Sequence, residues 1–374
     1  ERGLLMIKKF FECYLPITSC NLKCEYCYVP QIGWKQGQIK RFKYPAQIMR
    51  KALSKERLGC PCYFSICGGG ETLMHPDLLP LVRELLNEGH YVNLTNNGTY
   101  SKGIDAIVDS IGKEDISRLH FAFSLHWDEL IRLNLLDVFA LNVNKVKAAG
   151  ASFLIQINLC DSYVRQRDQI KDYCMRNFGA LPQVVATRRE GNLVVDPSKT
   201  ELYTKMSVAE YKSAGDEFES PLFDFTMLNF NRKIDRFCYA GAWSYCLELS
   251  EGLLKSCYCN GPTVNIFDCP TMPIPTHPVG RHCKHKYCVN SSHFLSLGVV
   301  PEMYCDVTYA GLRNRTEAGW YNACMADVLS HKLVETNHQC GCIGRALHEL
   351  GYWARSGVSV VRRAMGKLVR QKSM

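Results

Sequence analysis

The sequence lacks the features that would mark a membrane-spanning, secreted or repetitive protein. No apolar run approaches the ~18 residues that a bilayer-spanning helix needs. The opening stretch, ERGLLMIKKFFECYLP, has no apolar core of signal-peptide length followed by a small-residue cleavage site. Internal repeats and low-complexity tracts are also missing. These absences favour a soluble protein in a reducing, cytoplasmic compartment.

Neither positive nor negative charge is in large excess. The formal net charge is +9 over 374 residues, and the basic residues are spread out except near the C-terminal end. We therefore expect no nucleic-acid partner. A hydrophobic content of 47% in a chain of this length can fill one large α/β domain and a smaller one. The composition is that of a folded enzyme.

Cysteine, in contrast, is abundant, with 20 residues. In a long chain without a secretion signal, clustered cysteines are more often metal ligands or catalytic groups than disulfide partners. Scattered cysteines such as Cys160 and Cys174 are expected to be small buried apolar residues.

Short apolar runs alternate with helical patterns through the first half of the chain. The helical patterns include PAQIMRKALSK, HPDLLPLVRELLNEG and LLDVFALNVNKVKAAG, whose apolar residues recur at spacings of three and four. Right-handed crossovers would place these helices outside a parallel sheet. The pattern predicts an α/β fold, a partial (β/α)6 barrel of the TIM type, with strands in FFECYLPIT, CYFSICG, YVNLTNN, LHFAFSLH, SFLIQINL and QVVATRR.

The alternation stops near residue 190, and the chain becomes rich in Cys, Gly, Pro and Tyr from Cys238 onward. A smaller metal-stapled module is expected there. The predicted organisation is a barrel over 1–190, a connector over 191–235, a Cys-rich auxiliary domain over 236–310 and a helical C-terminal extension over 311–374.

The stretch CNLKCEYC places Cys20, Cys24 and Cys27 directly after the first predicted strand, without a fourth cysteine nearby. A structural zinc site closes a tetrahedron with four ligands, usually from two separated pairs. Three thiolates suit a cluster of four irons in which each cysteine holds one iron and the fourth iron stays open. The loop predicts an iron–sulfur site whose open position is reactive.

With Tyr26 before the last thiol, this loop matches CxxxCxΦC, where Φ is aromatic, and resembles the radical S-adenosylmethionine superfamily over about residues 8–190. The resemblance implies a [4Fe-4S] cluster whose open iron is chelated by S-adenosylmethionine. It also implies one-electron cleavage of the sulfonium, a 5′-deoxyadenosyl radical and hydrogen abstraction from substrate. Flavodoxin or ferredoxin would be the reductant. We assign no further catalytic residue.

A glycine run follows the second predicted strand: Gly68, Gly69 and Gly70, then Glu71. The resemblance implies that this loop binds the amino group of the cofactor's methionine, with Thr72 in place of the family's usual proline. The alternative is a glycine-rich turn with a helix-capping glutamate.

Other candidates for contact with the cofactor lie at the ends of the later strands, and among them His126 and the two arginines are candidates for contact with the substrate as well. The resemblance places Tyr26 on the adenine, although the usual glycine-containing adenine motif of the fifth strand is missing. Turn formation and buried hydrogen bonding are the alternatives for the polar residues, and solvated side chains for the arginines. The candidates are Asn96, Asn97, Ser124, His126, Gln156, Asn158, Arg188 and Arg189.

The Cys-rich module opens with Cys238, Gly252 and Cys257, which resembles the CX9-15GX4C start of SPASM and twitch extensions. The later CX2CX5CX3C part of the SPASM pattern is absent, so one auxiliary [4Fe-4S] cluster is expected. Zinc, with help from His282 and His285, is the alternative. The predicted ligands are Cys238, Cys257, Cys283 and Cys288, with Cys259, Cys269 and Cys305 in reserve.

The final stretch places Val358, Val361, Met365 and Leu368 on one helical face and basic residues mostly on another. Docking of this helix on its own domain is favoured over contact with an anionic membrane surface.

The sequence defines the substrate less closely than it defines the cofactor. Because 19 residues precede Cys20, a fused leader-binding domain is not expected, which favours a small polar or carbohydrate-like substrate over a ribosomally made peptide. A non-catalytic, zinc-stapled scaffold is the rival from another class. Brown iron–sulfur protein that bleaches with dithionite would distinguish an enzyme from that scaffold.

Overall fold

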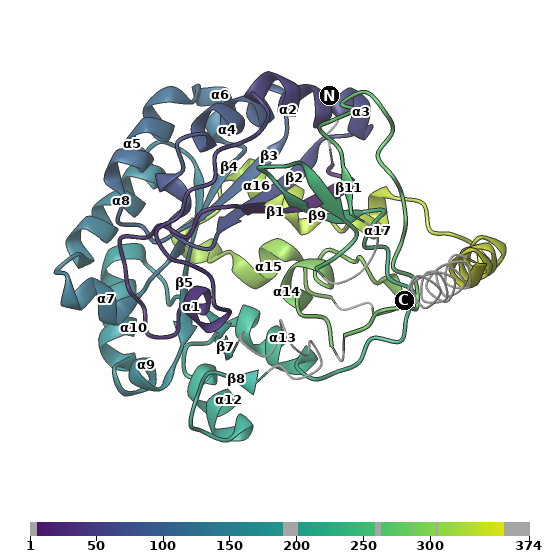
Figure 1. Cartoon of the computed structure of the whole chain (residues 1–374). Coiled ribbons are helices and arrows are strands. Elements are labelled where there is room, and N and C mark those ends of the chain that lie inside the picture. The colour runs from purple at the N-terminus through teal and green to yellow at the C-terminus, as the bar shows by residue number, and fades with distance from the viewer. Residues whose placement is uncertain (1–5, 190–200, 259–262, 286, 304–305, 355–374) are drawn as a thin grey trace, which may run out of the picture.

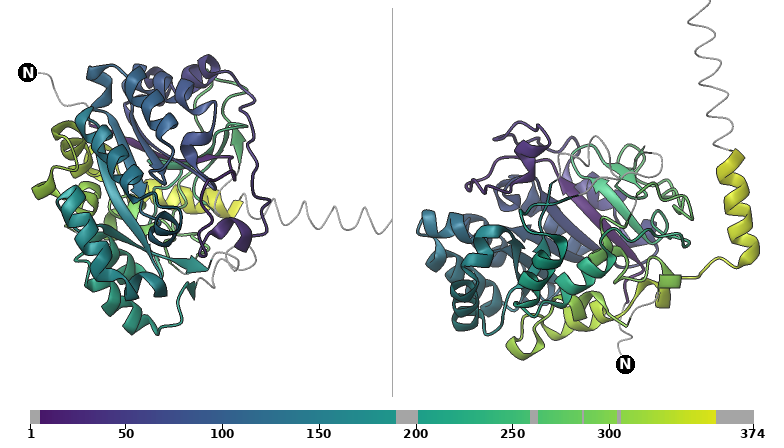
Figure 2. Two further views of the ribbon diagram at one scale, coloured as in Figure 1. Left: turned by 90° about the vertical axis from the view of Figure 1, so that its left-hand side faces the viewer. Right: turned by 90° about the horizontal axis from the view of Figure 1, so that it is seen from below.

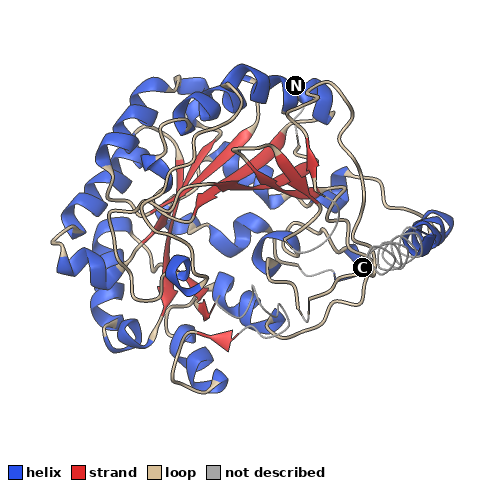
Figure 3. Ribbon diagram, in the orientation of Figure 1, coloured by secondary structure: helices blue, strands red, loops and turns tan. Residues whose placement is uncertain are grey.

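The computed structural model describes residues 6–189, 201–258, 263–285, 287–303 and 306–354. Its centre is a nine-stranded sheet with the order β11-β10-β9-β1-β2-β3-β4-β5-β6 (Figures 1 and 3). The first six strands are parallel and follow one another in sequence order, as predicted. They are β1 (Lys9–Leu15), β2 (Cys62–Gly68), β3 (Tyr91–Asn96), β4 (Leu119–Ser124), β5 (Ser152–Leu159) and β6 (Gln183–Ala186). The strands β6 and β11 form the two edges of this sheet and do not pair with each other, so the barrel is partial.

Helices between these strands cover the outer face of the sheet (Figure 1). In α4, the buried residues Leu81, Val82 and Leu85 recur at helical spacing and face the sheet. These outer elements are α1 (Tyr28–Gln31), α2 (Ala46–Ala52), α3 (Lys55–Leu58), η1 (Thr72–Met74), α4 (Leu78–Asn87), α5 (Ser101–Ser110), α6 (Lys113–Ile116), α7 (Trp127–Arg132), α8 (Leu136–Ala148), α9 (Asp161–Arg165) and α10 (Arg167–Phe178).

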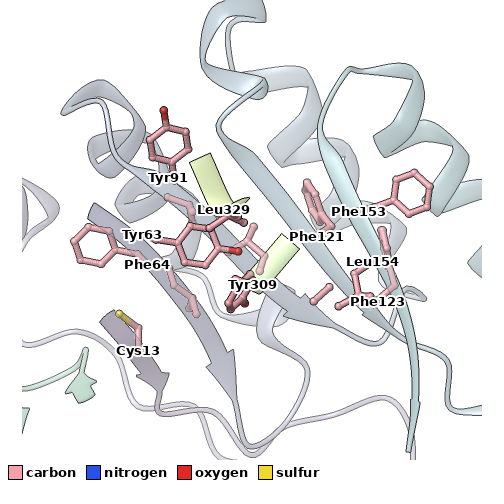
Figure 4. Close-up of a cluster of buried hydrophobic side chains, with 14 of the residues drawn as sticks. Cys13, Tyr63, Phe64, Tyr91, Phe121, Phe123, Phe153, Leu154, Tyr309 and Leu329 are labelled. Atoms are coloured by element: carbon pink, nitrogen blue, oxygen red, sulfur yellow. The ribbon is translucent and has the colours of Figure 1, made fainter. Parts of the chain in front are cut away.

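Helices from the end of the chain cover the inner face at the start of the strands. Phe10 near the beginning of β1 contacts Phe294 and Tyr309, and Tyr63 of β2 also packs on Tyr309. Figure 4 shows Tyr309 beside Tyr63. The amide of Phe153, early in β5, donates to the Trp320 carbonyl over 2.9 Å. Side chains and helices therefore cover the amino ends of these strands, whereas the predicted site residues follow their carboxyl ends.

This inner layer begins with α14 (Ser291–Phe294) and ends with α17 (Leu333–Thr336). Arg313 donates to the Ser292 carbonyl, and Asn322 caps α16 through the Met325 amide. Between its two ends lie η2 (Pro301–Met303), α15 (Tyr309–Arg313), η3 (Thr316–Ala318) and α16 (Ala323–Ser330).

A hairpin of the Cys-rich module extends the barrel sheet. β9 (Ser244–Glu248) pairs in parallel with β1, from Phe10 opposite Ser244 to Tyr14 opposite Glu248. β10 (Leu253–Lys255) returns antiparallel and pairs with β11 (Val264–Asn265). Gly252 in the turn has φ +72°, a conformation that favours glycine. One sheet thus joins the predicted barrel and the predicted auxiliary module, whose boundaries stay predictions.

The remaining segments flank the barrel. A two-stranded sheet, β7 (Arg188–Arg189) with β8 (Glu201–Leu202), is followed by α12 (Val208–Asp216) and α13 (Pro221–Asn229). Residues 342–354 form a last helix, while the predicted tail face from Val358 to Leu368 lies outside the described residues. None of the described helices combines the length and the apolar character that crossing a bilayer requires.

Candidate active site

Three thiols share the loop at the carboxyl end of β1. Cys20 is exposed, while Cys24 and Cys27 are partly buried. Burial raises the pKa of each thiol, and the neighbouring sulfurs of Cys20 and Cys27 raise the pKa of Cys24 further. A bound cation would stabilise the thiolates that the bare loop disfavours. The donor set and its crowding fit an iron–sulfur cluster.

The loop is fixed by the ends of two neighbouring strands. Asn21 accepts from Asn97 Nδ2 over 2.8 Å and donates to Thr99 Oγ1 over 2.7 Å, both just after β3. The Lys23 amide donates to Glu129 Oε2 in α7 over 2.7 Å. These bonds hold the three thiols in one place before any ligand arrives.

The glycine run of the second strand lies against the segment that leads to Cys20. The Gly70 amide donates to the Ile17 carbonyl over 2.7 Å, and the Glu71 amide donates to the Ser19 carbonyl over 2.8 Å. A Cβ on Gly70 would overlap the Ser19 carbonyl oxygen and lie 2.7 Å from the carbonyl carbon. Glycine is required here because two backbone segments meet, whatever ligand the loop also binds.

Glu71 is buried, and its carboxylate accepts two backbone amides. Oε1 accepts from Leu73 over 2.9 Å and Oε2 accepts from Asn97 over 2.8 Å. Burial raises its pKa to about 7, although both amides act in the opposite direction. The carboxylate thus ties the β2 loop to the β3 loop. Each oxygen keeps a lone pair, so the predicted contact with a cofactor ammonium stays a prediction.

The two candidate asparagines after β3 have different roles. The Asn96 side chain bonds the Leu94 carbonyl and the Gly98 amide, as turn-forming asparagines do. Asn97 Nδ2 lies 3.8 Å from Cys20 Sγ. Asn97 therefore belongs to the cysteine loop's surroundings, whereas Asn96 shapes the turn.

Tyr26 is anchored by its hydroxyl, which lies 2.8 Å from His126 Nδ1 and 3.0 Å from the Tyr163 hydroxyl. Burial lowers the pKa of His126 to about 4, so the imidazole is neutral at neutral pH. The ends of β4 and β5 thereby hold the aromatic residue of the cysteine loop. Sequence reasoning did not single out Tyr163, because an isolated tyrosine early in a helix carries no motif.

Polar side chains also mark the inner edge of β4 and β5. Ser124 and Gln156 are register partners, and Gln156 Nε2 donates to Ser124 Oγ over 3.3 Å. Asn158 lies two residues along β5, on the same face of the strand, and is partly buried. The candidates predicted on these two strands therefore share one surface at the carboxyl end of the sheet.

The two arginines of β7 diverge. Arg188 Nη1 donates to the Val289 carbonyl over 2.9 Å, so it joins the barrel to the Cys-rich module. The guanidinium of Arg189 lies 5.0 Å from the ring centroid of Tyr203, on the exposed side.

Sequence reasoning missed a buried carboxyl group, Glu12, in the centre of β1. Its Oε2 lies 3.5 Å from Asn290 Nδ2, its Oε1 lies 3.8 Å from Cys67 Sγ, and His293 Nδ1 is 3.9 Å away. Burial raises the pKa of Glu12 to about 7. The sequence did contain a sign of this group. The apolar run FFECYLP holds one carboxylate, and that carboxylate must be buried if the run is a central strand.

Tyr258 connects this interior with the Cys-rich module. Burial raises the pKa of its phenol, and the charges of Glu12, Cys246 and Cys67 raise it further. The side chain nevertheless keeps 45% of its surface exposed. Tyr258 follows Cys257 in the chain, is partly exposed, and has its phenol within electrostatic range of Glu12.

The four predicted auxiliary thiols come together. Burial is the largest cause of the raised pKa of both Cys257 and Cys288. The thiols of Cys288 and Cys238 raise the pKa of Cys257 further, and the thiols of Cys238 and Cys283 raise the pKa of Cys288 further. Burial raises the pKa of Cys238 to about 12. Cys246 is a fifth thiol beside Cys257 that sequence reasoning missed. Of the reserves, Cys269 is exposed, and Cys259 and Cys305 lie outside the described residues.

The described part of the chain contains no preformed site for a single metal ion. No three His, Cys, Asp or Glu side chains among those residues lie close enough to hold one ion. His282 pairs with Glu349 over 2.8 Å and stacks on Tyr352.

Comparison with known proteins identifies the region around the first cysteine loop. The model of the Radical SAM superfamily matches residues 14–136. The match covers about a third of the chain. It supports the prediction of an iron–sulfur enzyme and includes the cysteine loop, the glycine run, the end of β1 and the strands β2 to β4.

Individual relatives are distant. A candidate glycyl-radical enzyme activating enzyme of Methanocaldococcus jannaschii is 24% identical over 102 residues, which are 27% of this chain and 35% of that protein. Among solved structures, Streptococcus suis SuiB bound to S-adenosylmethionine has 16% identity and a TM-score of 0.49, covering 70% of this chain and 64% of SuiB. AnSMEcpe with bound AdoMet has 17% identity and a TM-score of 0.48, covering 70% and 79%. The chain therefore spans about a third of the curated relative and less than two thirds of SuiB.

Proposed function

We propose that this chain is an iron–sulfur enzyme that cleaves S-adenosylmethionine reductively and removes a hydrogen atom from a carbon of a small polar substrate. The observation that carries the proposal is the crowded set of Cys20, Cys24 and Cys27 at the carboxyl edge of a parallel sheet, inside the region that the Radical SAM superfamily model matches. Three thiol ligands leave one iron of a [4Fe-4S] cluster open.

The three thiolates would hold that cluster, and the bound cluster with S-adenosylmethionine would supply electron transfer and hydrogen-atom abstraction. The chain's own residues make this possible by fixing geometry. Glu71 joins the glycine loop to Asn97, and Asn97 in turn holds Asn21 of the cysteine loop. Binding therefore needs little rearrangement of the loops.

The surface for S-adenosylmethionine runs along the carboxyl ends of β2, β4 and β5. The loop of Gly68, Gly69 and Gly70 presents backbone groups, and Ser124 with Gln156 and Asn158 presents hydroxyl and amide groups. Hydroxyl and amide groups suit the ribose and the amino acid part of the cofactor. Tyr26, anchored through His126, supplies an aromatic surface beside the thiols.

The inner face below this surface supports a small polar substrate. Glu12, Asn290 and Cys67 converge there, and the charge of Glu12 raises the pKa of the Tyr258 phenol. A carboxyl group near pKa 7 both accepts and donates hydrogen bonds at neutral pH, which suits hydroxyl or amine groups. We propose Glu12 as a substrate-contacting residue. Modification of a peptide remains the second candidate, in which only one side chain would reach this depth.

The second thiol group would hold an auxiliary [4Fe-4S] cluster through Cys238, Cys257, Cys283 and Cys288. Zinc is the alternative occupant, and the pairing of His282 with Glu349 counts against a zinc site that would use this imidazole.

Cleavage and iron content test these assignments together. After anaerobic reconstitution and reduction by dithionite or flavodoxin, wild type should form 5′-deoxyadenosine and bind about eight irons per chain. Replacing Cys20, Cys24 and Cys27 with Ala should abolish cleavage and leave about four irons. Replacing Cys160, Cys174 and Cys324 is the matched control for loss of three thiols.

Each outcome bears on a separate claim. Cleavage that survives the first triple change would overturn the catalytic assignment. Zinc retained by that variant would replace the auxiliary cluster with a structural ion, and a variant free of metal would remove the auxiliary site altogether.

A further inference from the structure

The last described helix, residues 342–354, presents a row of large apolar side chains to solvent. Ile343, Leu347, Leu350 and Trp353 keep 79%, 62%, 67% and 65% of their surface exposed. Their spacings of four, three and three residues place them along one side of the helix. Single exposed apolar residues are ordinary on protein surfaces, but an aligned set indicates a binding surface.

Contacts on the opposite side fix how this helix is oriented. Arg345 pairs with Glu302, His348 Nε2 lies 2.9 Å from the Pro278 carbonyl, and Tyr352 stacks on His282. Figure 2 shows the helix at the margin of the molecule, away from the sheet. The polar side thus docks on the protein while the apolar row points outward.

We propose that this row docks on an anionic membrane surface. The sequence that follows, residues 355–374, contains Arg355, Arg362, Arg363, Lys367, Arg370 and Lys372 and no acidic residue. Its Val358, Val361, Met365 and Leu368 keep the spacing of the exposed row. Apolar residues with a tryptophan, adjoining a purely basic segment, are the signature of helices that lie in the lipid headgroup region.

Charge decides between this occupant and a second copy of the chain. Spacings of three and four would also suit a two-stranded coiled coil. A second copy carries the same positive charge and so offers no charge complementarity, and a parallel pair would set the two basic segments side by side, where like charges repel. An anionic surface attracts the basic segment in either orientation, so lipid is the occupant with complementary charge. The inference is independent of the proposed function, because no residue of the cysteine sites takes part.

Vesicle sedimentation with the full chain tests the proposal. The probe is a vesicle of phosphatidylcholine with about 30% phosphatidylserine, compared with phosphatidylcholine alone. Wild type should sediment with the anionic vesicles, and Leu347→Glu with Leu350→Glu should weaken binding by about tenfold or more. Because the Debye length shortens as salt is added, binding to the anionic vesicles should weaken as the sodium chloride concentration is raised.

The matched control is Leu141→Glu with Leu228→Glu. These leucines are 63% and 65% exposed on α8 and α13, so the control adds the same charge at equal exposure elsewhere. It should bind like wild type, and both double variants should keep wild-type melting temperatures and cleavage of S-adenosylmethionine. If the Leu347 and Leu350 pair fails to fold, Leu347→Gln alone replaces it.

Three results would overturn the proposal. Wild type could stay in the supernatant with anionic vesicles, or the two double variants could bind equally well. Sedimentation equilibrium could also show a dimer that Leu347→Glu with Leu350→Glu dissociates while vesicle binding is absent, in which case a second copy covers the row.

Discussion

Two buried carboxyl groups, Glu12 and Glu71, differ in the partners that surround them. Burial raises the pKa of both to about 7. Glu71 accepts two short backbone amide bonds, which tie the β2 loop to the β3 loop. The contacts of Glu12 are longer, at 3.5 Å to Asn290 and 3.8 Å to Cys67. The proposed substrate contact of Glu12 rests on these longer bonds, and the predicted cofactor contact of Glu71 rests on the lone pairs that its two amide bonds leave.

The raised pKa of Glu12 predicts a pH-dependent stability. Because the folded value of about 7 exceeds the ordinary 4.5, the stabilisation from the protonated carboxyl is fully present below pH 4.5 and lost as pH rises through 7. Glu12→Gln imitates the protonated form. It should match wild type near pH 4.5 and exceed it at pH 8 by on the order of 3 kcal/mol in unfolding free energy.

Urea unfolding at both pH values measures this difference, and the exposed Glu114→Gln is the control. Equal stability of the Glu12 variant and wild type at pH 8 would show that the carboxyl group is well compensated in its ionised form. In assays of S-adenosylmethionine cleavage, added substrate should change the rate of the Glu12→Gln variant less than that of wild type. The reason is that the proposed contact between residue 12 and the substrate loses its charge.

Sequence pattern located the residues that belong to local motifs and missed those defined by long-range contact. Cys20, Cys24 and Cys27 lie within eight residues, so spacing alone revealed them. Asn290 and Glu12 are 278 residues apart, and no periodicity connects them. For Glu71, the bond to the Leu73 amide caps η1, as the alternative interpretation of the glycine run expected, whereas the bond to the Asn97 amide joins residues that no local pattern connects.

At the scale of elements, the active-site edge is held by loops that contact one another. The amides of Gly70 and Glu71 bond the carbonyls of Ile17 and Ser19, directly before Cys20. The β2 loop therefore acts as a template for the cysteine loop. Its geometry depends on a residue without a side chain, since the two backbones are in contact at Gly70.

Gly70→Ala should displace the cysteine loop. The added methyl group meets the Ser19 backbone, which cannot move without shifting Cys20. We expect the variant to lose cleavage activity and the iron of the first cluster, with a destabilisation of about 1–3 kcal/mol. Iron analysis and 5′-deoxyadenosine formation measure the two effects.

Gly112→Ala is the control, because nothing lies within 4 Å of its Cβ position and its φ of −64° suits alanine. Full iron content and activity in the Gly70 variant would mean that the loop tolerates the displacement and that the close approach is incidental to the site.

The strands themselves were predictable because each of the six is a short apolar run bounded by turn residues. β2, β5 and the helix α8 lie inside the segments expected for them. The attachment of β9 to β1 was not predictable, since the pairing of Phe10 with Ser244 spans most of the chain. Cys246 is only 11 residues from Cys257, but it falls between the motif positions Cys238 and Gly252, so the motif did not single it out.

At the scale of the whole molecule, the end of the chain stabilises the beginning. Trp320 is fully buried, its Nε1 donates to the Phe178 carbonyl over 3.0 Å, and its ring packs on Phe153 of β5. The sheet also runs without interruption from β6 through β1 to the Cys-rich hairpin. Barrel and hairpin should consequently unfold together rather than as separate domains.

Trp320→Ala tests this cooperativity. Removing a buried tryptophan leaves a cavity and should cost about 3–5 kcal/mol. Hydrogen exchange resolved by segment should show the same loss of protection in β4 of the barrel and in β9 of the hairpin, because one global opening exposes both. Trp353→Ala, at an exposed position, should leave exchange in both strands unchanged. Faster exchange in β4 with unchanged exchange in β9 would mean that the hairpin folds independently, as the predicted domain boundary near residue 236 implies, despite the shared sheet.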